Sequence, residues 1–179
     1  RREKKMIFKK LLIAKNYKGP LKGEIIPQNK FYLYGLRNDR GIINLEYTLQ
    51  NLKRSLKLTL EIINKIQYNP KSKVLIFIND LPLKAMGSIF KKNKNTQIVT
   101  EKWIPGTLTK NYSNRKNFPL VIVFSKTNNT SISKECQKLK IPTIFLSNLD
   151  FDFKGISYPV PTNTKNIKSL YLLISLFKK

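Results

Sequence analysis

Two runs of five consecutive apolar residues constrain the fold of this chain more than any other feature. They are Val74 to Ile78 and Leu120 to Phe124, and neither alternates with polar residues. A strand with one face in water would alternate, whereas a strand of a parallel sheet is covered on both faces and stays apolar along its length. Each run therefore predicts a strand in the middle of a parallel sheet.

Helical patterns alternate with the strands. Asn44 is a plausible N-cap, and a long helix is predicted from there to about Tyr68. Its expected buried stripe recurs every three or four residues and consists of Leu45, Leu49, Leu52, Leu56, Leu60 and Ile63. Shorter patterns predict strands at Phe31 to Tyr34, Gly41 to Ile43, Gln97 to Val99 and Thr143 to Leu146, and helices at about 80–92, Ser131 to Leu139 and Thr164 to Phe177. In the last helix the expected stripe is Ile167, Leu170, Tyr171 and Ile174. This alternation predicts βαβ units and a three-layer α/β domain with a mostly parallel sheet.

Residues 1–30 differ in character from the rest. They are strongly basic and are interrupted by two glycines and two prolines, so they predict a basic N-terminal arm with one short helix from Met6 to Ala14. The remaining residues, 31–179, are expected to form a single domain, because the whole chain is close to the usual size of about 150 residues. Since the chain begins at Arg1 and not at Met, we expect that it has been processed or trimmed.

The charge of the chain predicts a polyanionic partner. The chain contains 35 Lys and Arg but only ten Asp and Glu, which gives a net charge of +25 on 179 residues. A small domain usually carries a net charge of about 2 to 8, and a larger excess destabilises the compact state by self-repulsion. The cations occur along the whole chain instead of in one tail. Because phosphates bound by Lys and Arg release condensed counterions, a nucleic acid is the expected partner.

Amino-acid usage adds a hint about the source. Lys, Ile and Asn are abundant, with 29, 21 and 18 copies, while Ala occurs twice and His is absent. The favoured residues have A- and T-rich codons, which indicates an AT-rich genome such as that of an organelle. A free-living organism with an AT-rich genome is the alternative.

Catalytic features are sparse. The turns after the two apolar runs match neither a glycine-rich nucleotide fingerprint nor a P-loop. The lack of His removes the commonest general base and metal ligand. Cys136 lies within a predicted helix and is interpreted as a packed thiol, and as the only cysteine it cannot form an intrachain disulfide. Asp150 and Asp152 would hold a divalent cation only if folding brought Asp80 to them. We therefore expect no enzymatic activity, no metal and no cofactor.

Neither a membrane nor a small-molecule substrate is expected as a partner. No apolar stretch approaches the roughly 20 residues that cross a bilayer. The only tryptophan, Trp103, lies in a predicted loop between Lys102 and Pro105-Gly106. Two roles remain open for it: its indole wedges into the domain and fixes the loop, or it stacks on a base or ribose of RNA.

Several segments together resemble one family, the second protein of the small ribosomal subunit. Residues 32–38 and 41–48 read YLYGLRN and GIINLEYT, which is similar to the family's strand, G-x-R-N turn and I-I-D-L-E-x-T helix start. Residues 102–109 read KWIPGTLT, similar to R-W-L-G-G-x-L-T-N. Near the end, residues 140–142, 158–163 and 167–170 read KIP, YPVPTN and IKSL, similar to G-I-P, Y-P-I-P-G-N and I-x-S-I. The similarity covers residues 31–177 in the correct order.

The resemblance implies a flavodoxin-like (Rossmann-like) α/β domain without enzymatic activity, bound to ribosomal RNA on the solvent side of the small subunit and next to other ribosomal proteins. Bacterial relatives insert a long helical hairpin where this chain has only the residues between Thr109 and Phe118. This difference, together with the biased composition, favours a mitochondrial ribosome. Other departures from the family are Lys102, Pro105 and Lys110 in the tryptophan loop, and Ser125 and Ser147 at strand ends where relatives often carry Asp.

We expect recognition of RNA through its phosphates and its shape. The residues expected to contact it are Arg1, Arg2, Lys4, Lys5, Lys9, Lys10, Arg37, Asn38, Arg40, Lys91, Lys92, Lys94, Lys102, Trp103, Thr107, Thr109, Lys110, Asn111, Arg115 and Lys116. Two rival hypotheses remain: a Rossmann-like RNA-processing or nucleotide-binding enzyme, and an assembly factor that leaves the mature ribosome.

Overall fold

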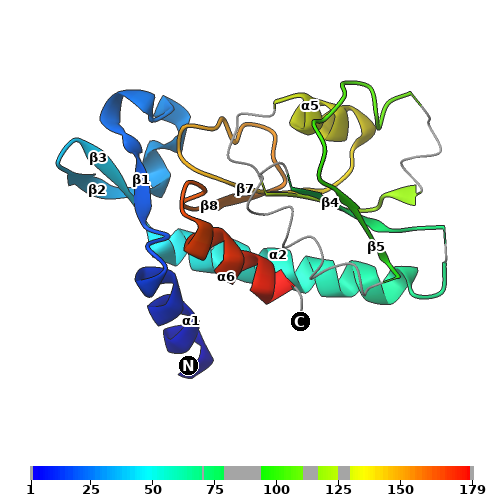
Figure 1. The fold of residues 1–179 in the computed structure, drawn as a ribbon, viewed down its shortest axis with the longest axis horizontal. Coiled ribbons are helices and arrows are strands. Elements are labelled where there is room, and N and C mark those ends of the chain that lie inside the picture. Colours follow the sequence, from blue (N-terminus) through cyan, green and yellow to red (C-terminus); the bar gives the residue numbers. More distant parts are fainter. Residues whose placement is uncertain (1, 70, 79–93, 111–116, 125–129, 178–179) are drawn as a thin grey trace.

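The computed structural model of the chain describes residues 2–69, 71–78, 94–110, 117–124 and 130–177. The helix predicted at about 80–92 lies outside these residues. The structure confirms an α/β fold with one parallel and one smaller antiparallel sheet (Figure 1). No helix in the described part of the chain is both long and apolar enough to cross a membrane.

The parallel sheet has five strands. They are β4 (Val74–Ile78), β5 (Thr96–Val99), β6 (Val121–Phe124), β7 (Thr143–Ser147) and β8 (Tyr158–Pro161). Their order across the sheet is β5-β4-β6-β7-β8, and every neighbouring pair is parallel. Counted along the chain within this sheet, the order is 2-1-3-4-5, which is the flavodoxin-like arrangement. Every residue of β4 and β6 is buried, as their unbroken apolar runs predict.

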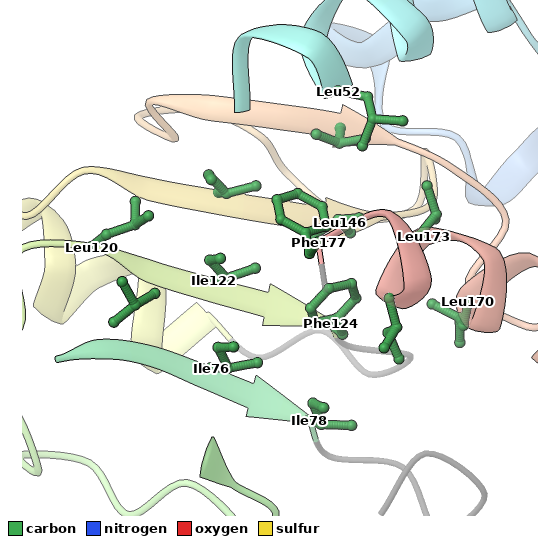
Figure 2. Packing of buried hydrophobic residues seen from close by; sticks show 14 of the residues in the cluster. Leu52, Ile76, Ile78, Leu120, Ile122, Phe124, Leu146, Leu170, Leu173 and Phe177 are labelled. Carbon is green, nitrogen blue, oxygen red and sulfur yellow. The ribbon is translucent and has the colours of Figure 1, made fainter. Parts of the chain in front are cut away.

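Helices cover both faces of this sheet. Two helices, α2 (Leu45–Ile66) and α6 (Ile167–Phe177), lie on one face, and α5 (Thr130–Leu139) lies on the other (Figure 1). Alternate residues of each strand enter different cores: Ile76 and Ile78 pack on the α2 and α6 side, whereas Leu75 and Phe77 pack on the α5 side. On the first side, Phe124 of β6 meets Phe177 of α6 edge to face, with ring centroids 5.9 Å apart (Figure 2).

The buried face of α2 follows most of the leucine stripe that the sequence predicts. The predicted N-cap is present, since the Asn44 Oδ1 accepts from the Glu46 amide at 3.0 Å, and Leu45, Leu49 and Leu52 are buried as expected. Of the later stripe positions, Leu56 and Ile63 are partly buried and pack against the same core, whereas Leu60 is 53% exposed. The buried positions beyond Leu52 are Ser55, Thr59 and Ile66. The hydroxyls of Ser55 and Thr59 donate to carbonyls one turn earlier, at 2.8 Å each, so the helix itself satisfies these buried polar groups.

The last helix departs further from its predicted stripe. Leu170 and Ile174 are buried as predicted, but Ile167 and Tyr171 are 46% and 52% exposed. Leu173 and Phe177 take their place in the core. The helix therefore packs on the sheet through positions 170, 173, 174 and 177. Its buried face differs from the predicted stripe in using 173 and 177 in place of 167 and 171.

The smaller sheet precedes α2. It contains β1 (Lys18–Leu21), β2 (Leu33–Arg37) and β3 (Arg40–Ile43) in the antiparallel order β1-β3-β2. Short 3₁₀ helices occupy Lys22–Glu24 and Pro27–Tyr32, so the strand predicted from Phe31 begins two residues later. The second of these helices is held by Asn29, whose amide donates to the carbonyls of Leu149 and Phe151 at 3.0 and 2.6 Å.

Much of the segment predicted as an arm has regular structure. Its first helix, α1 (Arg2–Ile13), projects from the body in Figure 1 and contacts α2 and α6. Leu11 is completely buried in the α2 and α6 core. After α1, the Asn16 amide donates to the Thr162 hydroxyl at 2.9 Å, linking residues that are 146 positions apart. The domain boundary at residue 31 stays a prediction.

Candidate nucleic-acid interface

The loop around Trp103 is anchored by its tryptophan. The indole is only 5% exposed and packs edge to face on Phe77 of β4, with centroids 5.6 Å apart. Its Nε1 donates to the Glu135 carboxylate at 3.0 Å. The ring thus lies in the core with its polar group satisfied, which is the first of the two roles left open for it. We therefore reassign Trp103 from a direct RNA contact to a residue that positions the loop, because a buried ring cannot stack on a base.

One carboxylate holds the rest of this loop. Besides the indole, Glu135 of α5 accepts three backbone amides, from Gly106 at 2.8 Å, Leu108 at 2.9 Å and Thr109 at 3.3 Å. Both carboxylate oxygens are used, and the side chain is 8% exposed. Hydrogen bonds to an ionised group are the stronger kind, and several on one carboxylate compensate for its burial. Glu135 therefore sets the path of residues 103–109.

The outer side of the loop is polar and basic. Lys102, Thr107 and Lys110 are exposed, and Thr109 is partly exposed. Gly106 has a φ of +95°, a conformation that favours glycine, and the stem of Lys110 lies beside it. With its inward amides bound to Glu135, the loop presents these side chains to solvent in a fixed arrangement. That is what a phosphate-contacting loop needs.

The hairpin between β2 and β3 carries a second group of expected contacts. Asn38 and Asp39 both have left-handed backbone angles, with φ of 49° and 56°, which form the two-residue turn that suits a hairpin. Arg37, Asn38 and Arg40 are all exposed. The polar turn predicted at Arg37 to Arg40 is therefore confirmed as a tight, exposed and basic turn.

The structure does not gather the expected contacts into one patch. Lys5, Lys9 and Lys10 are exposed on α1, and Lys94 is exposed just before β5. The hairpin and α1 lie toward one end of the molecule, and β5 lies toward the other (Figure 1). Arg2 and Lys4 belong to α1. The expected contacts that lie outside the described residues are Arg1, Lys91, Lys92, Asn111, Arg115 and Lys116.

The groups considered for catalysis or metal binding take structural positions. Cys136 is buried, and burial raises the pKa of its thiol from 9.0 to about 11, so it is the packed thiol that the sequence predicts. Burial also raises the pKa of Asp150, against a lowering by Lys165. Asp152 accepts from the Lys154 amide at 2.9 Å. Asp80 lies outside the described residues, within which no three metal-ligating side chains cluster.

Glu135 is the functional residue that sequence reasoning missed. A signal was available, because it lies among the apolar positions of its helix, three residues after Ile132 and next to Cys136. A carboxylate on a buried stripe requires partners. The pattern does not reveal that these partners lie 26 to 32 residues earlier, in the tryptophan loop.

Comparison with protein families gives one match that extends over nearly the whole chain. The model of the family described as ribosomal protein S2 matches residues 11–119 and 110–179. The two matched segments meet at 110–119, where the sequence predicts that a helical hairpin is missing.

Individual relatives agree with this match. A protein of the liverwort Marchantia polymorpha named small ribosomal subunit protein uS2m is 28% identical, over 97% of this chain and 90% of its own length. A protein of the same name from Schizosaccharomyces pombe is 23% identical over 86% of this chain, and small ribosomal subunit protein uS2 of Ehrlichia chaffeensis is 24% identical over 80%. The chain spans 66% and 64% of these last two relatives, just under two thirds of their length. The liverwort alignment runs over 225 positions, more than the 179 residues of this chain, so that relative has additional residues within the aligned part.

Proposed function

Because this chain belongs to the ribosomal protein S2 family, we propose that it is a structural constituent of the small ribosomal subunit and binds ribosomal RNA through its basic surface. The observation that carries this proposal is the family match, which covers both halves of the chain. The net charge of +25 supports it, because a scaffold with this excess of cations needs a polyanion around it. The protein is not an enzyme, and its mechanism is binding and positioning.

The protein works in the mitochondrial ribosome. The liverwort relative, the Schizosaccharomyces pombe relative and a third from Neurospora crassa all bear the name uS2m, the mitochondrial form. The abundance of Lys, Ile and Asn, whose codons are rich in A and T, agrees with this location. Its function there is to support translation.

The proposed RNA contacts are side chains on several faces. Lys102, Thr107, Thr109 and Lys110 form a preorganised loop, held from inside by Glu135 and Trp103. The hairpin residues Arg37, Asn38 and Arg40 form a second contact, and the lysines of α1 and Lys94 form two more. A cation-rich surface on several sides suits a protein enclosed by folded RNA and neighbouring ribosomal proteins, because each face then meets phosphate or an acidic neighbour. The expected contacts outside the described residues remain part of this proposal.

Salt dependence tests the proposal directly. The full-length chain is titrated with transcribed small-subunit ribosomal RNA in a filter-binding assay between 50 and 200 mM KCl. If six or more phosphates are neutralised, the affinity falls by about a thousandfold or more over this range. A fall of less than tenfold would contradict binding through phosphates.

Two further measurements address the rival hypotheses. An assembly factor would be missing from mature particles, whereas a constituent is present at one copy per purified mitochondrial small subunit. A nucleotide-binding enzyme would bind a nucleotide or methyl donor saturably, and we expect no such binding by isothermal titration calorimetry.

A further inference from the structure

The small antiparallel sheet contains a cleft lined by three cations. A cavity of about 390 Å³ is lined by Lys18, Arg37 and Arg40, together with Tyr17, Asn38, Gly41 and Ile42. The three cations come from three different strands of the sheet. Among the described residues, those that line the cavity carry no carboxylate; the nearest acid in sequence is Asp39, in the turn between Arg37 and Arg40. In the part of the chain that the structure describes, no ion pair joins any of these three cations to an acidic side chain.

Strand register places two of these charges directly opposite each other. Arg37 of β2 pairs with Arg40 of β3, and Lys18 of β1 pairs with Ile42 of β3. Because Arg40 and Ile42 are two residues apart, they point to the same face of the sheet, and so do their partners Arg37 and Lys18. Like charges directly opposite each other in a sheet destabilise the pairing. This pairing is therefore unfavourable in the free protein.

Two backbone features enforce the arrangement. The left-handed residues Asn38 and Asp39 make the turn so short that Arg37 and Arg40 must face each other. In addition, a Cβ on Gly19 would lie 2.8 Å from the Gly41 carbonyl oxygen, so β1 approaches β3 too closely to admit a side chain there. A weak hydrogen bond from the Arg40 guanidinium to the Gly19 carbonyl, at 3.4 Å, directs this side chain across β1.

We propose that this cleft binds one phosphate group, and that the backbone of the ribosomal RNA supplies it. This inference rests on the proposed function and specifies one binding site within it. A phosphate in the cleft supplies the counter-charge for Arg37, Arg40 and Lys18, so it offsets the repulsion between the two arginines. The planar guanidinium groups suit its oxygens, and Lys18 adds a third charge from the neighbouring strand. The side-chain amide of Asn38 supplies a further donor at the rim.

Paired arginine substitutions test the cleft. Arg37→Ala removes one of the facing charges, and Arg54→Ala, at an exposed position on α2, is the control with the same change in net charge. We expect Arg37→Ala to lower the affinity for the RNA about tenfold at 100 mM KCl and to reduce the slope of log affinity against log salt by about 1. Arg54→Ala should change the affinity less than twofold. Arg37→Lys should keep the slope and lose part of the affinity, because lysine retains the charge without the fork.

Thermal unfolding of the free protein excludes misfolding as the cause of any loss. Since Arg37 faces Arg40, its replacement relieves repulsion, and Arg37→Ala should unfold at the same or a higher temperature than the original chain. A variant that binds RNA less well while unfolding no earlier supports the cleft. Unfolding at a clearly lower temperature would show that the arginine pair stabilises the fold without an anion, and would overturn the proposal.

The outcomes separate this inference from the function on which it rests. If the unaltered chain shows no salt-dependent binding, the proposed function fails. If the unaltered chain binds and Arg37→Ala behaves like Arg54→Ala, the function stands and the cleft is overturned. Inorganic phosphate, added up to 20 mM in the unfolding assay, distinguishes the source of the anion. One outcome is that phosphate raises the unfolding temperature of the original chain but not that of Arg37→Ala, while both proteins bind RNA equally well. In that case the cleft binds free phosphate, and the RNA backbone is not its ligand.

Discussion

Single side chains decide the shape of the surface that this protein offers to RNA. The clearest case is Glu135, a buried acid in a chain that has few acids. Within the described residues it forms no ion pair and accepts from four N–H groups of a loop that is distant in sequence. Its charge is thus used inside the domain, and the cations on the outside of the loop remain available for phosphate.

Replacing Glu135 by glutamine tests this role. Glu135→Gln replaces one oxygen acceptor with an NH₂ group, which cannot accept the amides bound there, so we expect a loss of about 1 to 3 kcal/mol in the free energy of unfolding. The only tryptophan should then become accessible to water, and its fluorescence emission should shift to longer wavelength. The affinity for ribosomal RNA should fall several-fold, because the loop loses its fixed path.

Glu101→Gln is the matched control, since Glu101 is exposed and lies two residues before Trp103. It makes the same chemical change without touching the four hydrogen bonds. An unchanged emission spectrum and stability in Glu135→Gln would show that the carboxylate does not hold the loop.

Among the helices and strands, α2 shows how packing departs from a regular pattern. Its leucines are buried as far as Leu52, and further along Leu56 and Ile63 are only partly buried against the same core. Ser55 and Thr59 are buried in this second half. Their own helix satisfies the polar groups of these two residues. The displaced Leu60 lies at the surface.

The same substitution at two positions of this helix checks the packing. Leu52 is 1% exposed and Leu60 is 53% exposed. We expect Leu52→Ala to lower the free energy of unfolding by about 2 to 5 kcal/mol through a cavity, and Leu60→Ala to change it by about 0.5 kcal/mol or less. Urea denaturation measures both. Both changes are leucine to alanine in one helix, so the difference in helix propensity is the same for the two variants. Equal losses in the free energy of unfolding would mean that Leu60 is also in the core.

Across the molecule, the segment that follows α1 is joined to the segment that follows β8. Beside the Asn16 and Thr162 contact, the amides of Asn163 and Asn166 donate to the carbonyls of Lys15 and Ala14, at 3.1 Å each. The segment after β8 thereby holds the end of α1 and fixes the direction in which the basic helix projects. Basic residues near the N-terminus are thus carried on an anchored helix.

A neighbouring pair of leucines tests whether α1 belongs to the folded domain. Leu11 is fully buried, whereas Leu12 is 43% exposed. We expect Leu11→Ala to cost about 2 to 5 kcal/mol in the free energy of unfolding and Leu12→Ala less than about 1 kcal/mol. Differential scanning calorimetry, with a single transition in both variants, provides the measurement. If neither change affects stability, residues 1–13 behave as the separate arm that the sequence predicts.

Local patterns were sufficient for most of the architecture. The unbroken apolar runs predicted the buried parallel strands, Asn44 predicted the start of α2, and the turn at Arg37 to Arg40 was recognisable, because each depends on residues close together in the chain. The excess of cations and the family resemblance predicted a ribosomal RNA-binding protein. Periodicity could not show that Leu60, Ile167 and Tyr171 would be exposed, because that depends on the shapes of the opposing surfaces.

The details of the site depended on contacts between distant residues. Composition placed Trp103 and the arginines among the candidates, but only folding brought Glu135 to the tryptophan loop and Lys18 to the two arginines. A buried carboxylate needs hydrogen-bond donors, and cations that lie close together favour binding of an anion. The linear sequence does not show which of these groups come into contact. Close approach in three dimensions therefore decided which polar groups are used inside the protein and which remain available to RNA.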